Sequence, residues 1–298
     1  MQWPVVALES TVITHGLPYP QNKQLAEDME NEVRNHSVVP ATIAVVAGQV
    51  HIGVQPPDLE RLARGEAVHK ISSRDYGPAI AKKWDGGTTV AGTMLAAQAA
   101  GIQVFATGGI GGVHRQVSGQ SSAVSMDISA DLPQLARTPM IVVCAGAKAI
   151  LDLEATLEYL ETFAVPVVGY GTDEFPAFYS RSSGLMASVR ADTPQEVVAI
   201  ARAHWEMGMQ SAVLVTLPPP EDVALPREHV DGAIEQALQD AARQNVRGQA
   251  VTPFLLQRMT EITSGASLHA NLGLLRNNAR LAAEIARHLV KGRRTTLV

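Results

Sequence analysis

Cysteine is almost absent from the sequence, which has 298 residues and only one cysteine, Cys144. A single thiol excludes an internal disulfide and is typical of a protein in a reducing compartment. Cys144 closes an apolar run, so we expect a buried packing residue there rather than a nucleophile.

Aromatic residues are scarce as well, at 4%, although the apolar fraction is 46%. Small and aliphatic residues must therefore form the core, which is typical of helices packed closely on a sheet and disfavours an all-β sandwich. We expect a single domain over residues 1–298, a length that buries a substantial core.

The sequence also lacks an excess of positive charge and a long apolar run. Its net charge of −5 excludes a broad basic surface for nucleic acid or an anionic membrane, so any phosphate must be bound locally. No apolar run reaches the span of a bilayer, and the first ten residues have no basic segment before an apolar core. We expect a cytoplasmic protein that binds neither nucleic acid nor membrane.

Strand and helix patterns alternate over the first two thirds of the chain, and the last third is helical. Apolar runs predict strands at 5–8, 40–47, 48–54, 104–107, 141–143, 165–170 and 212–217. Apolar residues at helical spacing predict helices at 22–35, 57–64, 91–100, 151–163, 193–209, 227–244, 254–263 and 267–289.

The segment Ile141–Asp152, IVVCAGAKAILD, predicts a buried strand that ends in a tight loop carrying Lys148. We expect Lys148 to lie beside a helix start, where unsatisfied N–H groups and the positive dipole end favour loss of its proton. A neutral amine is a nucleophile. An isolated loop lysine is more commonly a solvated side chain, so this hypothesis depends on its neighbours.

Two further groups of charged residues follow short apolar runs. Glu9 comes directly after the strand expected at 5–8, where a carboxylate is costly unless it has a partner or a task. Lys70 and Arg74 bring two cations within five residues. Such a pair suits an anion contact, although a solvated loop is the more common outcome.

The run Gly108–Gly112 is the densest in glycine and follows a predicted strand. Its N–H groups can approach an anion closely while Thr107 adds a hydroxyl, and His114 follows directly. The run does not match the GxGxxG dinucleotide motif. A plain turn is an equally good interpretation.

Two carboxylates, Asp127 and Asp131, come after a polar loop that we expect to be exposed at 115–125. Asp127 offers the oxygen that a hard divalent cation prefers, and either residue is also typical of a turn or a helix cap. Asn271 lies in the last predicted helix, where asparagine is an indifferent helix former, so it could face a functional site or lie on the surface. The aromatic residues of 171–179 suit a pocket for a planar base or a subunit contact.

Seven segments, taken in order, resemble the pseudouridine-5′-phosphate glycosidase family. They are ALESTVITHGLPYPQN (7–22), GGTTV (86–90), FATGGIGGVHR (105–115), DISADL (127–132), VCAGAK with ILD (143–152), TDEFPAFY (172–179) and VTPFLL (251–256). They extend over nearly the whole chain, and their joint occurrence is specific.

The resemblance implies a three-layer α/β/α fold with a mixed central sheet, assembled as a homotrimer. It implies reversible cleavage of pseudouridine 5′-phosphate to uracil and ribose 5-phosphate with a divalent metal, typically Mn²⁺. Lys148 matches the lysine that attacks C1′ of the opened ribose and forms a Schiff base, Glu9 the acid in ring opening, and Asp127 the metal ligand. The positions that match substrate contacts are Lys70, Val90, Thr107, His114, Ser129, Ala130, Asp131 and Asn271, with Asp131 also as a proton-transfer group.

The chemistry of a C–C glycosidic bond agrees with a lysine at the centre of the site. Direct departure of uracil would leave a carbanion-like group, whereas an iminium at C1′ accepts the electrons. The lysine must be neutral to form it, so its pKa must fall below the free value of about 10.4.

Three features depart from the family pattern. Ser73 stands where a second basic residue is common beside Arg74, Ala149 replaces a frequent serine, and the loop 116–125 is longer than expected. The first two departures affect the predicted phosphate contacts, and the longer loop affects the predicted metal side of the site.

Two other hypotheses stay open. A lyase of the class I aldolase type would use Lys148 on a sugar phosphate, with no need of a uracil pocket or of a metal at Asp127. A non-catalytic regulator would bind a sugar phosphate only. The joint presence of Lys148, Glu9 and Asp131 argues against the regulator.

Overall fold

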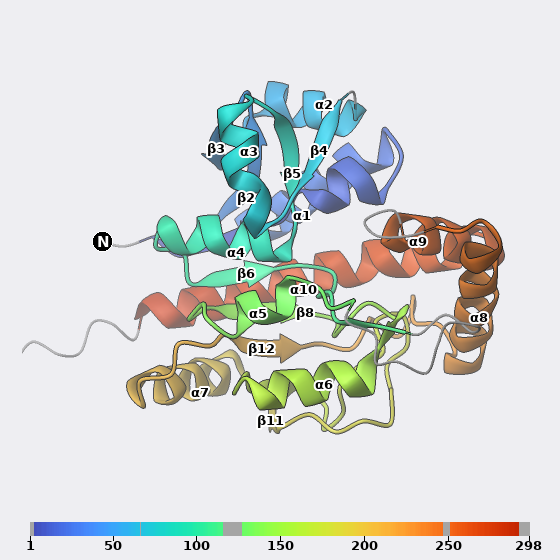
Figure 1. The fold of residues 1–298 in the computed structure, drawn as a ribbon. Coiled ribbons are helices and arrows are strands. Elements are labelled where there is room, and N and C mark those ends of the chain that lie inside the picture. Colours follow the sequence, from blue (N-terminus) through green and yellow to red (C-terminus); the bar gives the residue numbers. More distant parts are fainter. Residues whose placement is uncertain (1–2, 66, 116–126, 247–250, 292–298) are drawn as a thin grey trace, which may run out of the picture.

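The computed structural model describes residues 3–65, 67–115, 127–246 and 251–291 (Figure 1). Ten strands form one central sheet: β1 (Val5–Leu8), β2 (Val39–Val46), β3 (Gln49–Ile52), β4 (Val68–Ile71), β5 (Asp85–Thr88), β6 (Val104–Ala106), β8 (Ile141–Cys144), β10 (Val167–Tyr170), β11 (Val189–Ala191) and β12 (Val213–Thr216). A separate short pair consists of β7 (Val113–His114) and β9 (Leu151–Asp152).

The described helices alternate with these strands and then fill the last third of the chain. They are α1 (Gln21–Asn35), α2 (Pro56–Arg64), α3 (Tyr76–Ala81), α4 (Val90–Ala99), α5 (Asp131–Leu135), α6 (Leu153–Thr162), α7 (Pro194–Glu206), α8 (Arg227–Arg243), α9 (Val251–Ile262) and α10 (Ala266–Lys291).

The sheet is mixed. Its strands lie in the order β11-β10-β12-β8-β6-β1-β2-β5-β4, with β3 also paired to β2. From β11 to β2 each neighbouring pair is parallel, whereas β3 and β5 run antiparallel to β2. The central strands β1, β6 and β8 read VVAL, VFA and IVVC, which suits parallel strands that are covered on both faces.

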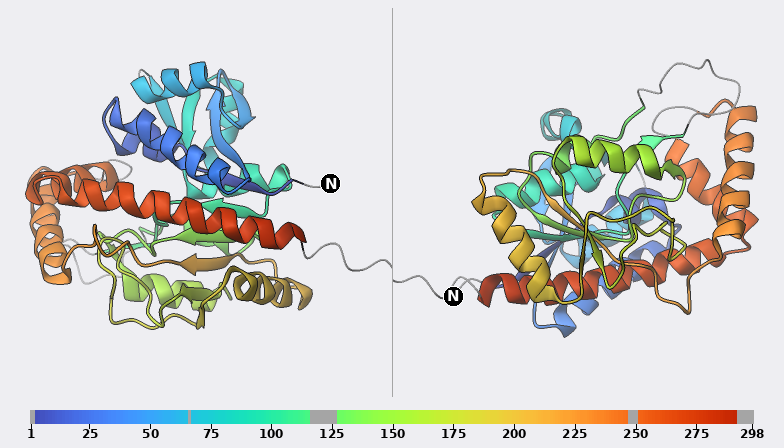
Figure 2. Two further views of the ribbon diagram at one scale, coloured as in Figure 1. Left: turned by 180° about the vertical axis from the view of Figure 1, so that it is seen from behind. Right: turned by 90° about the horizontal axis from the view of Figure 1, so that it is seen from below.

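Helices cover both faces of the sheet (Figure 2). The long helix α10 contacts β1, β6 and β8 and also packs on α1 and α7. On the other side, α4 contacts β1, β2 and α5. Helix α4 is apolar around most of its circumference and brings its backbone close to the sheet edge: a Cβ at Gly92 would lie 2.6 Å from the carbonyl oxygen of Ile71. The three-layer α/β/α prediction is confirmed.

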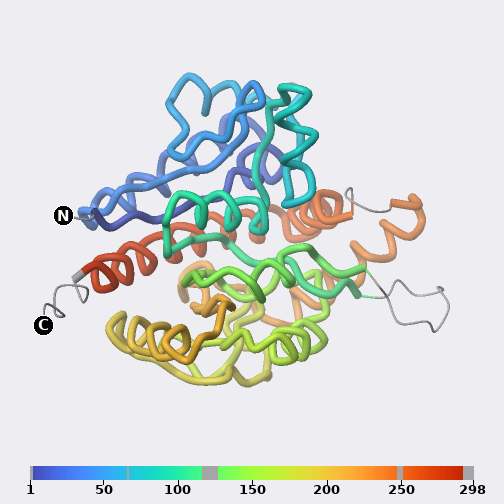
Figure 3. Tube along the Cα trace, turned by 60° about the vertical axis from the view of Figure 1, so that its left-hand side comes forward, coloured from blue at the N-terminus to red at the C-terminus, as the bar shows by residue number. Residues whose placement is uncertain are grey.

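Helices α8 and α9 pack on each other at one end of the molecule, beside one end of α10 (Figure 3). This helical end confirms the predicted helical last third of the chain. Cys144 is fully buried, as expected. No helix in the described ranges has the length and apolar character that crossing a membrane requires.

The prediction was wrong around Asp152. A helix was expected from residue 151, but Leu151 and Asp152 form β9 and α6 begins at Leu153. Asp152 caps that helix, since its Oδ1 accepts a hydrogen bond from the N–H of Ala155 at 3.0 Å. The polar loop expected at 115–125 lies outside the described residues from 116 onward.

Candidate active site

Three adjacent parallel strands, β1, β6 and β8, deliver the central residues of the site. Glu9 follows β1, Thr107 follows β6, and the loop after β8 leads to Lys148. Ligands of open α/β sheets bind outside the carboxyl ends of the strands. The strand order therefore brings together side chains that lie far apart in the sequence.

Glu9 is 7% exposed and accepts a short hydrogen bond from the Thr107 hydroxyl. Burial raises its pKa above the ordinary value, and this effect exceeds the opposing attraction of the nearby Lys148 ammonium. The Thr107 hydrogen bond and Lys70 also oppose the rise, whereas Asp131 adds to it. Glu9 is therefore a carboxyl group suited to carry a proton.

The loop that carries Lys148 is fastened to the glycine run, not to a helix. The Lys148 N–H donates to the Ile110 carbonyl at 3.1 Å, and the Ile110 N–H donates to the Gly146 carbonyl at 3.1 Å. Gly146 has φ +91°, and a Cβ there would lie 2.5 Å from the Pro176 carbonyl oxygen. The expectation that Lys148 lies beside a helix start is wrong, because β9 separates it from α6.

The glycine run serves close packing more than anion binding. The Gly111 N–H donates to Asp131 at 2.8 Å, and a Cβ at Gly111 would lie 2.1 Å from the Ser129 hydroxyl. At Gly109 a Cβ would lie 2.6 Å from the ring of Phe178. Because the N–H groups of Ile110 and Gly111 already have partners within the protein, they do not form the expected anion cradle.

Asp131 ties two backbone segments together. Its carboxylate accepts hydrogen bonds from the N–H groups of Ala91, at 2.9 Å, and Gly111, at 2.8 Å. It is the first residue of α5 and does not cap that helix, since Ala130 is the N-cap residue. The bonds hold the start of α4 and the glycine run at the cavity wall.

Asp131→Ala is expected to lower the free energy of unfolding by about 2–4 kcal/mol, since each buried N–H group that loses its acceptor costs about 1–3 kcal/mol. Urea denaturation followed by circular dichroism measures the change. Asp152→Ala, which removes one such bond at a half-buried helix start, is the matched control and should cost about 1 kcal/mol. An equal loss of unfolding free energy in the two variants would contradict a stabilising role for the two hydrogen bonds that Asp131 accepts.

Two more basic side chains share the electrostatics of the site. Burial, and then the nearby Lys148, lowers the pKa of Lys70, while Asp131 and Glu9 partly offset this shift. Burial also lowers the pKa of His114, against the attraction of Asp127. Both groups have a weakened hold on their proton at the wall of the site.

The main cavity has a volume of about 700 Å³ and is lined by most of the predicted site residues. Those that line it are Glu9, Lys70, Val90, His114, Asp127, Ser129, Ala130, Asp131 and Lys148. Thr107 is fully buried behind Glu9. The structure thus brings the predicted catalytic, substrate-binding and metal residues to one place.

A smaller cavity of about 60 Å³ adjoins the first and shares Glu9, Lys70 and Lys148 with it. Its walls include Phe178, Leu256, Leu275 and the predicted Asn271. Of the aromatic residues in the described segment 171–179, Phe178 lines it, whereas Phe175 and Tyr179 do not. Its mostly apolar walls suit a planar base.

Residue-level sequence reasoning missed Thr11, His15 and Thr252, which line these cavities. Thr11 and His15 lie around a single π-helical turn, Val12–Gly16, a conformation that recurs at functional sites. Burial, then Lys70, lowers the pKa of His15. The only signal was their position inside the family segments 7–22 and 251–256.

Asp127 is the predicted ligand for a divalent cation, and it lines the main cavity. Its side chain is exposed at the cavity wall, and in the described part of the chain no three His, Cys, Asp or Glu side chains gather as a metal cage. A single carboxylate suits a hard cation that keeps several waters and also binds a substrate phosphate.

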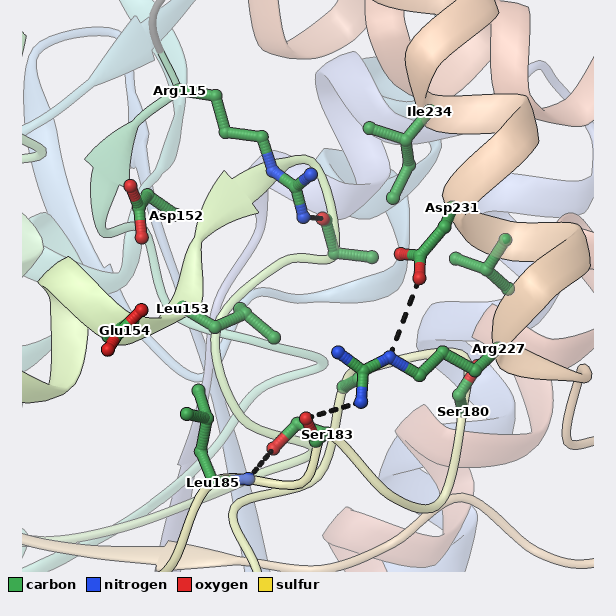
Figure 4. Close-up of a pocket in the computed structure, with 13 residues that line it drawn as sticks. Arg115, Asp152, Leu153, Glu154, Ser180, Ser183, Leu185, Arg227, Asp231 and Ile234 are labelled. Atoms are coloured by element: carbon green, nitrogen blue, oxygen red, sulfur yellow. Dashed lines mark hydrogen bonds and ion pairs between the residues drawn. The ribbon is translucent and has the colours of Figure 1, made fainter.

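Another cavity, of about 300 Å³, lies behind the Lys148 loop (Figure 4). Arg115 donates from Nε to the Leu151 carbonyl at 2.9 Å and from Nη2 to the Ala149 carbonyl at 3.3 Å. Across the cavity, Arg227 pairs with Asp231 at 3.5 Å and donates to the Ser183 carbonyl at 2.6 Å. None of the predicted site residues lines this space, so Arg115 braces the Lys148 loop from outside the site.

Fold and site together define a three-layer α/β protein with a lysine-containing cavity at the carboxyl ends of its central strands. The family model described as Indigoidine synthase A like protein matches residues 1–288. The chain belongs to this family.

Relatives match nearly the whole chain. A Chloroflexus aurantiacus protein named pseudouridine-5′-phosphate glycosidase is 57% identical over 286 residues, which cover 95% of this chain and 92% of that protein. A Geobacillus kaustophilus protein of the same name is 50% identical over 286 residues, 96% of this chain and 93% of that one. The resemblance predicted from the sequence segments is confirmed.

Two solved structures share the fold. The prealnumycin C-glycosynthase AlnA in complex with ribulose 5-phosphate has a TM-score of 0.87 and 40% identity, over 98% of this chain and 94% of that one. An indigoidine synthase A-like protein from Thermotoga maritima has a TM-score of 0.88 and 36% identity, over 98% and 94%.

Proposed function

We propose that this protein cleaves the C–C glycosidic bond of pseudouridine 5′-phosphate reversibly, giving uracil and ribose 5-phosphate. The observation that carries the proposal is that Lys148 and the buried Glu9 line the same cavity, where burial raises the pKa of Glu9. The names of the relatives and the sugar-phosphate complex of the C-glycosynthase support the same substrate class.

Ring opening comes first, and Glu9 supplies its proton. The electron pair of uracil N1 moves through C6 to form a double bond between C5 and C1′ as the C1′–O4′ bond breaks. O4′ takes the Glu9 proton and becomes a hydroxyl. A buried carboxyl group with a raised pKa holds that proton until O4′ accepts it.

Lys148 then adds through Nζ to C1′, and the electrons return to the uracil ring. The Glu9 carboxylate takes the proton that the amine loses and passes it to C5 as the C1′–C5 bond breaks. The nitrogen electron pair forms the C1′=N iminium, and uracil leaves neutral. Water adds to C1′ and releases ribose 5-phosphate together with the free amine of Lys148, and the proton that remains returns to the Glu9 carboxylate.

The remaining side chains hold the substrate. The smaller cavity, with Phe178 and Asn271, takes the uracil ring. Lys70, Val90, Thr107, His114, Ser129, Ala130 and Asp131 surround or support the sugar phosphate. Asp127 would hold Mn²⁺ or another divalent cation, which would neutralise phosphate charge. The active form is a homotrimer that works in the cytoplasm as a lyase with a Schiff-base intermediate.

Incubation with pseudouridine 5′-phosphate, with and without Mn²⁺, tests the proposal by chromatography of uracil and ribose 5-phosphate. Equimolar release of both products is expected. Uridine 5′-phosphate should be spared, because its N1 carries the sugar and cannot open the ring in this way. No uracil at any metal concentration would refute the C-glycosidase, and ribose 5-phosphate imine formation without uracil release would favour the aldolase-type alternative.

A further inference from the structure

Two arginines from separate segments of the chain also line the main cavity. Arg74 follows β4 and Arg137 follows α5, and Ser72 and Ser73 lie on the same wall. Arg74 is exposed and lies 3.4 Å from Asp75, so a carboxylate partly neutralises its charge. Arg137 lacks this partner and is held in another way.

The guanidinium of Arg137 is oriented by a neutral acceptor. Its Nη2 and Nε donate to Oε1 of Gln134, at 2.7 and 3.3 Å. Gln134 is 1% exposed and donates from Nε2 to the buried Thr138 hydroxyl at 2.8 Å, which fixes the amide. The Ser73 hydroxyl donates to the same Oε1 at 3.0 Å. The amide therefore joins Arg137 to the Ser73 turn.

Arg137 has no carboxylate partner among the described residues that line this wall. Within the described ranges no carboxylate lies within 4.0 Å of its guanidinium, whereas Arg61, Arg258 and Arg276 each form an ion pair with an aspartate. Two of its five N–H donors have Gln134 as partner. The other donors can serve a ligand in the cavity.

We propose that Arg137, positioned by Gln134 beside Ser73, binds the phosphate of the sugar-phosphate substrate and determines specificity for the phosphorylated sugar. The inference rests on the proposed function and deepens it. The phosphate is at the opposite end of the sugar from C1′, so with C1′ at Lys148 it extends away from the lysine along the cavity. A planar guanidinium with free donors matches a phosphate in a bidentate way, which a lysine cannot.

Arg137→Gln tests the assignment. KM for pseudouridine 5′-phosphate and Kd for ribose 5-phosphate should both rise about 10- to 100-fold, as expected for loss of a charged hydrogen-bonding partner. The value of kcat should stay within about twofold, because the phosphate contact is the same in the ground and transition states. Arg137→Lys, which retains charge without the fork, should fall in between.

Arg61→Gln is the matched control, because Arg61 pairs with Asp85 and lines neither cavity of the site. It should leave KM and Kd unchanged. Calorimetric titrations of wild type and Arg137→Gln with ribose 5-phosphate, ribose and inorganic phosphate then identify the ligand. Binding of ribose should be equally weak in both proteins, and thermal melting should show that both are folded.

The outcomes separate this inference from the proposed function. If wild type releases uracil while Arg137→Gln keeps its KM and Kd, the Arg137 assignment is wrong and the C-glycosidase stands. If wild type releases no uracil but Arg137→Gln weakens ribose 5-phosphate binding, the reaction is wrong and the phosphate subsite stands. An effect of the substitution on inorganic phosphate alone would refute a substrate role.

Discussion

Lys148→Ala is expected to lower turnover of pseudouridine 5′-phosphate by about 10⁴-fold or more, as removal of a covalent nucleophile does in other enzymes. The same variant should lose the covalent adduct that borohydride traps when wild type is incubated with ribose 5-phosphate. The adduct would be measured by intact mass and located by peptide mapping. Lys148 reaches the cavity that Glu9 lines from the loop after the central strand β8.

The fold should survive this substitution. In the described part of the chain, the Lys148 side chain forms no ion pair or hydrogen bond, and its loop is held by backbone bonds to Ile110. Unchanged thermal melting of Lys148→Ala therefore checks that loss of activity is chemical. Lys148→Arg, which keeps the charge but cannot form the imine, is the second control and should be equally inactive. Labelling that persists in either variant would exclude Lys148 as the nucleophile.

The sequence predicted where Lys148 lies along the chain better than it predicted which side chains surround it. A strand of branched apolar residues that ends at a lysine is visible in IVVCAGAK, and the structure contains that strand as β8. The side-chain environment of Lys148 was not visible, because it depends on strand order. Only the adjacency of β8, β6 and β1 brings Glu9 and Thr107 to Lys148, and no local pattern encodes that adjacency.

The contacts of the glycine run and of Asp131 differ from those expected from their local sequence patterns, because they are made with segments distant in the sequence. Glycine at 109 and 111 was expected to admit an anion, but the contacts show that it admits the Phe178 ring and Ser129. From its local pattern Asp131 was expected to be a turn or cap residue, but its carboxylate oxygens accept hydrogen bonds from two backbone N–H groups of other segments. A glycine-rich segment indicates that atoms approach the backbone closely, and an aspartate after a loop indicates that donors need an acceptor. Which atoms and donors these are depends on the fold.

Glu9→Gln is expected to lower kcat by about 10²–10⁴-fold, the usual contribution of a positioned acid. The amide keeps the size of the side chain and accepts the Thr107 hydrogen bond, but it has no proton to give to O4′. The pH profile offers a sharper test. Because burial raises the pKa of Glu9, wild-type activity should persist above the ordinary carboxyl range and fall as pH rises through the raised pKa. Glu9→Gln should lose this descending limb.

The raised pKa of Glu9 also predicts that Glu9→Gln, which lowers activity, raises the stability of the fold at neutral pH. The folded protein holds the Glu9 proton more tightly than the unfolded chain, so its stabilising effect is complete below about pH 4.3 and is lost as pH rises through the folded-state pKa. At higher pH a buried charge remains, which the neutral amide avoids. Glu9→Gln should therefore be more stable than wild type at neutral pH while it is nearly inactive. Denaturant melts from pH 4 to 8 measure the difference, which should shrink toward acid pH; a difference independent of pH would show that Glu9 titrates normally.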